Sequence, residues 1–78
     1  MNENWVKHKV YQNAVKAEIV KQMLVENNIP AVLLNKQDSS YLFGVIELYV
    51  QKDHQLEAAA LIDSYGEENV LNQNPDED

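Results

Sequence analysis

The chain contains no cysteine and no arginine, and glycine and proline occur only twice each in its 78 residues. Without cysteine, it can form neither a disulfide nor a thiolate metal site. Without arginine, it lacks the guanidinium group, whose paired N–H donors recognise bases and bind phosphates, so nucleic-acid binding is not expected. The two isolated glycines, Gly44 and Gly66, cannot form a glycine-rich phosphate-binding loop. No apolar run approaches the about 18 residues that a membrane span needs, so no membrane partner is expected.

Acidic charge is abundant and unevenly distributed. Thirteen acids against six lysines give a net charge of −7, and five of those acids lie in residues 66–78. We expect a single α+β domain over residues 1–71, followed by a disordered acidic C-terminal tail over 72–78. The first residues lack the basic and apolar segments of a secretory signal, so a cytoplasmic location is expected.

Apolar periodicity predicts three strands, over residues 5–11, 31–36 and 45–51. The first and third alternate with a period of two, which assigns their side chains to opposite faces. The set expected to face the core is Val6, His8, Val10, Ile46, Leu48 and Val50, and the exposed set is Trp5, Lys7, Lys9, Tyr11, Val45, Glu47 and Tyr49.

A helical period predicts a first helix over residues 14–27. Asn13 is its expected N-cap, because the side-chain oxygen can accept an otherwise unpaired backbone N–H group. Asn28 can end the helix in the left-handed conformation, and Pro30 prevents its continuation.

A second helix is predicted over residues 54–65, with Asp53 as its N-cap. Gly66 is expected to end it, since glycine is the usual residue just past a helix. Residues 67–71 either add a short fourth strand or belong to a loop, and the sequence leaves both options open.

The predicted order is β-α-β-β-α, with the fourth strand as an option. Two helices on one face of a three- to four-stranded antiparallel sheet form a shortened ferredoxin-like β-α-β-β-α(-β) sandwich, an α+β fold. Without a fourth strand, the first strand becomes a second open edge, which Lys7 and Lys9 partly blunt. Such an edge can accept another chain, so we consider a homo-oligomer through the sheet edge or face.

Several segments, taken in order, resemble a family of small bacterial domains described as putative prokaryotic signal-transducing proteins. The resemblance covers roughly residues 5–65 and rests on Lys9-Val10-Tyr11, Ala17–Lys21 with Leu24, Asn28–Val32, Asn35–Tyr41 with Gly44, and Glu47–Val50. Family members often have glycine where Asn28 stands. The resemblance implies a shortened ferredoxin-like fold, an architecture related to the nitrogen-regulatory PII proteins, and a regulatory or binding role with no assigned catalytic residue.

The ten residues from Asn35 to Gly44 form the first candidate site. Hairpin connections usually have about two to five residues, and longer loops on a compact scaffold are often functional. Here a polar turn precedes the run Tyr41–Phe43, which argues against simple disorder. The residues expected to bind a ligand or partner are Asn35, Lys36, Gln37, Asp38, Ser39, Ser40 and Tyr41.

The exposed sheet face is the second candidate site. Trp5, Tyr11 and Tyr49 are expected to form an interaction surface there, among charged neighbours. Aromatic side chains with a polar group are enriched in interfaces, although an ordinary exposed sheet can also carry them. A partner surface and an ordinary sheet face therefore stay as alternatives.

The other chemistry-bearing residues form no catalytic or metal-binding pattern. His8 and His54 lack metal-ligand spacing, and no nucleophile elbow surrounds Ser39 or Ser40. We therefore expect no metal, no cofactor and no enzymatic activity.

Together these observations favour a non-enzymatic cytoplasmic regulatory or protein-interaction domain whose protein partner is unknown. The alternative is a small-ligand sensor of the PII-like type, which would bind an anion or a nucleotide near Lys36, Ser39 and Ser40. The two hypotheses differ in the surface that they use, so the geometry of the sheet face and of the loop bears on each.

Overall fold

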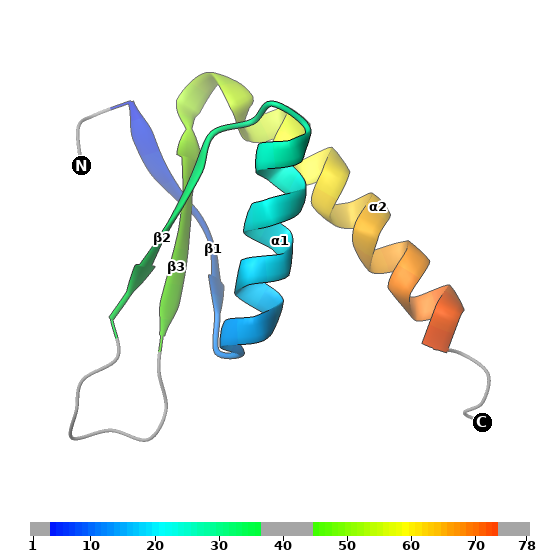
Figure 1. The fold of residues 1–78 in the computed structure, drawn as a ribbon. Coiled ribbons are helices and arrows are strands. Elements are labelled where there is room, and N and C mark those ends of the chain that lie inside the picture. The colour runs from blue at the N-terminus through cyan, green and yellow to red at the C-terminus, as the bar shows by residue number, and fades with distance from the viewer. Residues whose placement is uncertain (1–3, 37–44, 74–78) are drawn as a thin grey trace.

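A computed structural model describes residues 4–36 and 45–73 of the chain, and side chains as far as Tyr65. The elements follow the order β-α-β-β-α (Figure 1). They are β1 Trp5–Tyr11, α1 Ala14–Glu26, β2 Ala31–Asn35, β3 Ile46–Gln51, the 3-10 turn η1 Lys52–His54, and α2 Gln55–Gln73. The predicted order and the predicted strands are confirmed.

The three strands form an antiparallel sheet in the order β1-β3-β2. The central strand is β3, and β1 and β2 are the two edges. Both helices lie on the same side of this sheet (Figure 1). This is the predicted ferredoxin-like arrangement, and no residue that the structure describes pairs with β1 in place of a fourth strand.

The core lies between the sheet and the helices. Alternate residues of β3 point into it, and α1 contributes one stripe of side chains at helical spacing. The buried apolar residues are Tyr11, Ala17, Val20, Leu24, Ile29, Ala31, Ile46, Leu48, Val50 and Ala58. In a chain of 78 residues such a core is small, so each of these side chains contributes a large share of the stability.

Both ends of α1 are as predicted. The Asn13 side-chain oxygen accepts a hydrogen bond from the Lys16 backbone N–H at 3.0 Å. At the other end Asn28 has a φ of 66°, in the left-handed region. The Ile29 N–H then donates to the Leu24 carbonyl at 2.9 Å, and both side chains are buried, which is the hydrogen-bond pattern and apolar contact of a Schellman motif.

A β-bulge in β1 shifts the pairing of its second half. Lys7 pairs with Tyr49, but Lys9 pairs with Leu48, so His8 is an extra residue opposite β3. An extra residue in one strand reverses the faces that the following side chains occupy. Burial and the charge on Lys9 both lower the pKa of His8.

The predicted exposure of Tyr11 is therefore wrong. Tyr11 pairs with Ile46 and is only 7% exposed, whereas Val10, which straight alternation places in the core, is 49% exposed. Burial raises the pKa of the Tyr11 hydroxyl. Within the described part of the chain, this buried hydroxyl has no hydrogen-bond partner.

The second helix differs from its prediction at both ends. Asp53 lies inside the 3-10 turn rather than at an N-cap, and α2 begins at Gln55. Gly66 does not end the helix, which runs to Gln73, because a glycine inside a helix costs only about 1 kcal/mol relative to alanine. Residues 67–71 are therefore helical and form no fourth strand. Residues 74–78 lie outside the described residues, so the disordered tail stays a prediction.

We expect Tyr11→Ala to lower the free energy of unfolding by about 3–5 kcal/mol, the usual cost of removing a buried aromatic side chain. Val10→Ala should cost less than about 1 kcal/mol, because its side chain is half exposed. Tyr11→Phe should leave stability unchanged or raise it, since it removes a buried hydroxyl without a partner. Urea unfolding measures all three variants. A larger loss for Val10→Ala than for Tyr11→Ala would contradict the bulged register.

Candidate functional site

The side of the sheet opposite the helices forms a continuous surface, which we call the open face. Side chains directly opposite each other in an antiparallel sheet share a face, so the register assigns its members. They are Trp5, Lys7 and Val10 on β1, Glu47, Tyr49 and Gln51 on β3, and Val32 and Leu34 on β2. Most of these side chains are apolar or aromatic.

A charged cluster lies at the centre of the open face. The Lys7 ammonium nitrogen is 3.2 Å from Oε2 of Glu47, and the Tyr49 hydroxyl donates a hydrogen bond to Oε1 of Glu47 at 2.9 Å. Glu47 is only 8% exposed. Its cross-strand neighbours are Val10 and Leu34, so apolar side chains flank the carboxylate.

The cluster holds Glu47 in its charged form. The hydrogen bond from Tyr49, then the one from Lys7, lower the pKa of Glu47 below its usual value near 4.5. The same hydrogen bond to Glu47 raises the pKa of the Tyr49 hydroxyl. Both carboxylate oxygens therefore have a donor, and Glu47 does not need water as a hydrogen-bond partner.

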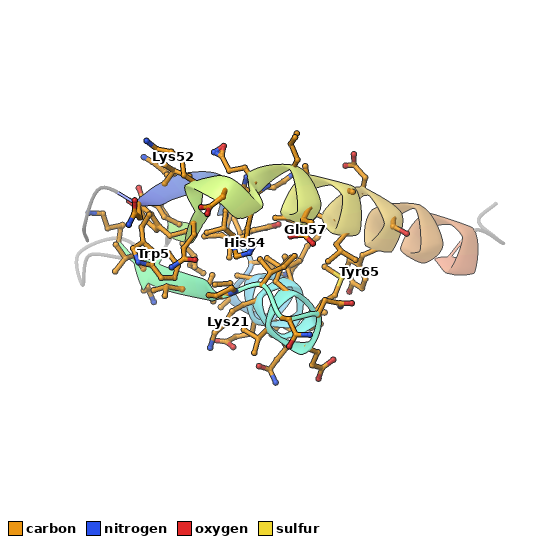
Figure 2. All side chains as sticks on the ribbon, turned by 90° about the horizontal axis from the view of Figure 1, so that it is seen from above. Trp5, Lys21, Lys52, His54, Glu57 and Tyr65 are labelled. Atoms are coloured by element: carbon orange, nitrogen blue, oxygen red, sulfur yellow. The ribbon has the colours of Figure 1, made fainter. Side chains whose placement is uncertain are left out.

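The structure brings together only part of the predicted sheet-face site. Trp5 and Tyr49 lie on the open face, whereas Tyr11 is in the core on the other side. Figure 2 shows Trp5 beside the strands, far from Tyr65, which lies between the helices. Sequence reasoning missed Val10 because it did not detect the bulge. It also missed Val32 and Leu34, although their spacing of two residues could have shown that they share a face.

The predicted loop site is described only at its first two residues. Asn35 is exposed at the end of β2, opposite Ile46, and therefore on the helix side of the sheet. Lys36 is also exposed, and its backbone N–H donates to the Val45 carbonyl at 2.7 Å. Gln37, Asp38, Ser39, Ser40 and Tyr41 lie outside the described residues, so their role stays a prediction.

A hollow of about 360 Å³ between the helices fits an anionic ligand poorly. It is lined by Glu18, Ile19, Gln22, Met23, Glu26 and Tyr65. Its size suits a small ligand, but its two glutamates would repel a phosphate or carboxylate. No group of His, Asp and Glu in residues 4–36 and 45–65 could hold a metal ion. Among the described residues, no helix is long and apolar enough to cross a membrane.

The geometry of the cluster predicts how Glu47 titrates. Tyr49→Phe and Lys7→Met should each raise the pKa of Glu47, because the first removes the tyrosine hydrogen bond and the second removes both the lysine hydrogen bond and the lysine charge, all of which lower it. Carboxyl-carbon NMR titration measures both shifts. Glu18→Gln, which removes an exposed charge from α1, is the matched control and should leave the Glu47 titration in place. A Glu47 pKa at or above 4.5 in the wild-type protein would contradict the cluster.

The same shift predicts how stability depends on pH. Because the pKa of Glu47 is lower in the folded protein than in the unfolded chain, Glu47 stabilises the fold above about pH 4.5. This contribution disappears as pH falls through the folded-state pKa. We therefore expect the difference in unfolding free energy between wild type and Glu47→Gln to shrink as pH is lowered from 6 toward about 3. Urea unfolding across that pH range is the measurement, and a constant difference would contradict the argument.

Comparison with known proteins bears on the whole fold. A family model described as "Putative prokaryotic signal transducing protein" matches residues 7–66, more than half of the chain. No curated protein and no solved structure matches. The matched range includes α1, β2, β3 and most of the open face. The chain therefore belongs to the family described as putative prokaryotic signal transducing protein.

Proposed function

We propose that this chain is a non-enzymatic regulatory domain of the cytoplasm that binds a protein partner through its open face. The family description supports a role in signal transduction in general terms. The observation that carries the proposal is the pairing of Glu47 with Lys7 and Tyr49 amid apolar side chains.

Because Glu47 is already paired, covering the open face with a partner costs less free energy of desolvation. A buried charge without a partner is costly, and so is a buried polar group without a hydrogen bond. Here the carboxylate already has two donors within the same surface. A partner that covers the face would therefore not leave Glu47 unpaired, and Lys7, whose side chain is 51% exposed, can still reach the rim.

The rest of the face supplies the contacts that interfaces favour. Trp5 and Tyr49 are half-buried aromatic side chains, and Val10 and Leu34 flank the central carboxylate. Aromatic residues near the centre of an interface often dominate its binding energy. In an ordinary antiparallel sheet with one solvated face, apolar side chains point to the core and the solvated face carries mostly polar side chains.

A PII-like sensor of anions or nucleotides is the alternative function. Its residues Ser39 and Ser40 lie outside the described residues, and Lys36 is an exposed lysine on the described side of the loop. A panel of nucleotides in a thermal-shift assay separates the two functions. A ligand that binds only the folded state raises the melting temperature, whereas the partner-binding domain we propose shows no such rise.

The open-face proposal predicts that one exposed valine matters and another does not. Val10 on the open face is 49% exposed, and Val25 on α1 is 44% exposed. We expect Val10→Lys to weaken capture of the partner at least about tenfold, the effect of 1.4 kcal/mol, when tagged protein is used to pull partners from the source cell. Val25→Lys should capture the partner as the wild type does.

The two variants control for each other, because both exchange a half-exposed valine for lysine. Circular dichroism on each variant checks that the fold is kept. If the wild type and both variants capture the same proteins equally, the open face is not the binding surface. If the wild type captures none, the partner-binding function itself is contradicted.

A further inference from the structure

The two edges of the sheet are protected to different degrees. β1 carries a bulge at His8 and two lysines, Lys7 and Lys9, and these are features by which natural proteins block edge-to-edge pairing. The other edge strand, β2, has the sequence AVLLN, with no charge, no bulge and no proline inside it. Pro30 immediately precedes it. β2 is therefore the edge that can accept another strand.

The backbone of β2 presents its hydrogen-bonding groups to this edge at known positions. The Lys36 N–H donates to the Val45 carbonyl, so this pair is hydrogen-bonded across the β2–β3 ladder. Hydrogen-bonded pairs in an antiparallel ladder recur at every second residue. Leu34 and Val32 therefore direct their N–H and C=O groups toward β3, and Ala31 and Leu33 direct theirs away from it.

We propose that β2 pairs with β2 of a second copy of this chain, antiparallel and centred on Leu33. In this arrangement the outward N–H and C=O groups of each Leu33 bond to those of the other Leu33. Because Leu33 is the middle residue of Ala31–Asn35, the two-fold axis aligns the full length of both strands. Val32 of each copy then lies opposite Leu34 of the other, on the open face.

Charge favours a second copy at this edge more than elsewhere. The chain has a net charge of −7, so two copies repel each other over most approaches. β2 carries no charged side chain. Beside it lie the paired Lys7 and Glu47 on the open face, Lys36 at its end and Glu18 on the helix side, which are two charges of each sign. Approach along β2 therefore brings together parts of two acidic molecules where the charges nearly balance.

The paired sheet also enlarges the open face. Three strands spaced by about 4.8 Å and about 20 Å long give a flat area of roughly 300 Å². A standard interface covers about 800 Å² per partner, so one copy offers a small platform. Pairing through β2 joins two such sheets into one and doubles the platform. The pairing itself rests on the backbone of β2, and only this use of it rests on the proposed function.

Sedimentation equilibrium of the purified chain tests the pairing with two matched double variants. In Val32→Lys/Leu34→Lys, each lysine at 32 would face a lysine at 34 of the second copy, so we expect a monomer. In Val32→Glu/Leu34→Lys, each glutamate would face a lysine, so we expect a dimer. The two variants share the change at 34 and differ only in the sign of the charge at 32.

Hydrogen exchange at Leu33 locates the contact. Its outward amide should exchange more slowly as the wild-type concentration rises, whereas the exposed Val10 amide on the β1 edge should not change. If the double variants fail to fold, chemical synthesis with an N-methyl group on the Leu33 nitrogen removes the outward donor and keeps the side chain. This variant should be monomeric.

A wild-type chain that stays monomeric up to about 1 mM overturns the proposal, because a dimer with a Kd of that value or tighter would be populated at that concentration. A dimer without protection at Leu33, or one that survives in the all-lysine variant, overturns it as well. These measurements need no partner protein, so a monomer leaves the partner-binding function to its own test, and a dimer does not establish that function.

Discussion

The extra residue at His8 determines how the two faces of the sheet are used. It turns Tyr11 toward the helices, where its ring fills the space beside Ile46, and it turns Val10 toward the open face opposite Glu47. Without the bulge, straight pairing would set Lys9 opposite Glu47 and send Val10 into the core. One inserted residue therefore supplies the core with an aromatic ring and the open face with an apolar neighbour for its carboxylate.

The bulge also determines which side chains surround Glu47. With Val10 on one side and Leu34 on the other, this carboxylate depends on Lys7 and Tyr49 for its partners. The open face is therefore nearly neutral on a chain that is strongly acidic overall, and its carboxylate has protein donors in place of water. The bulge also disfavours pairing along β1, so β2 is the less protected edge. The partner binding that we propose for the face and the self-pairing that we propose for β2 thus depend on the same arrangement.

The sequence predicts the fold well because local signals agree with each other. Asn13 caps α1, Asn28 ends it with a positive φ, and alternation on β3 places Ile46, Leu48 and Val50 in the core. The predicted end of α2 at Gly66 was wrong, because one glycine weakens a helix without ending it when neighbouring residues still favour the helix. The order of strands and helices is therefore readable from caps and periods, whereas the end of α2 is not.

The candidate site was predicted less well, because its geometry depends on pairing between distant segments. A bulge has no compositional signature in β1, and only the register against β3 reveals that Tyr11 and Val10 exchange places. The neighbours of Glu47 likewise come from residues 37 and 40 positions away along the chain, at Val10 and Lys7. Trp5 and Tyr49 could be assigned correctly because Trp5 precedes the bulge and Tyr49 lies on the regular strand.

Cross-strand NMR contacts test the register most directly. The bulged register predicts a strong nuclear Overhauser effect between the Hα protons of Val10 and Glu47, which form a closely spaced pair that is not hydrogen-bonded. A strong Hα contact between Lys9 and Glu47 in its place would show straight pairing and contradict this account.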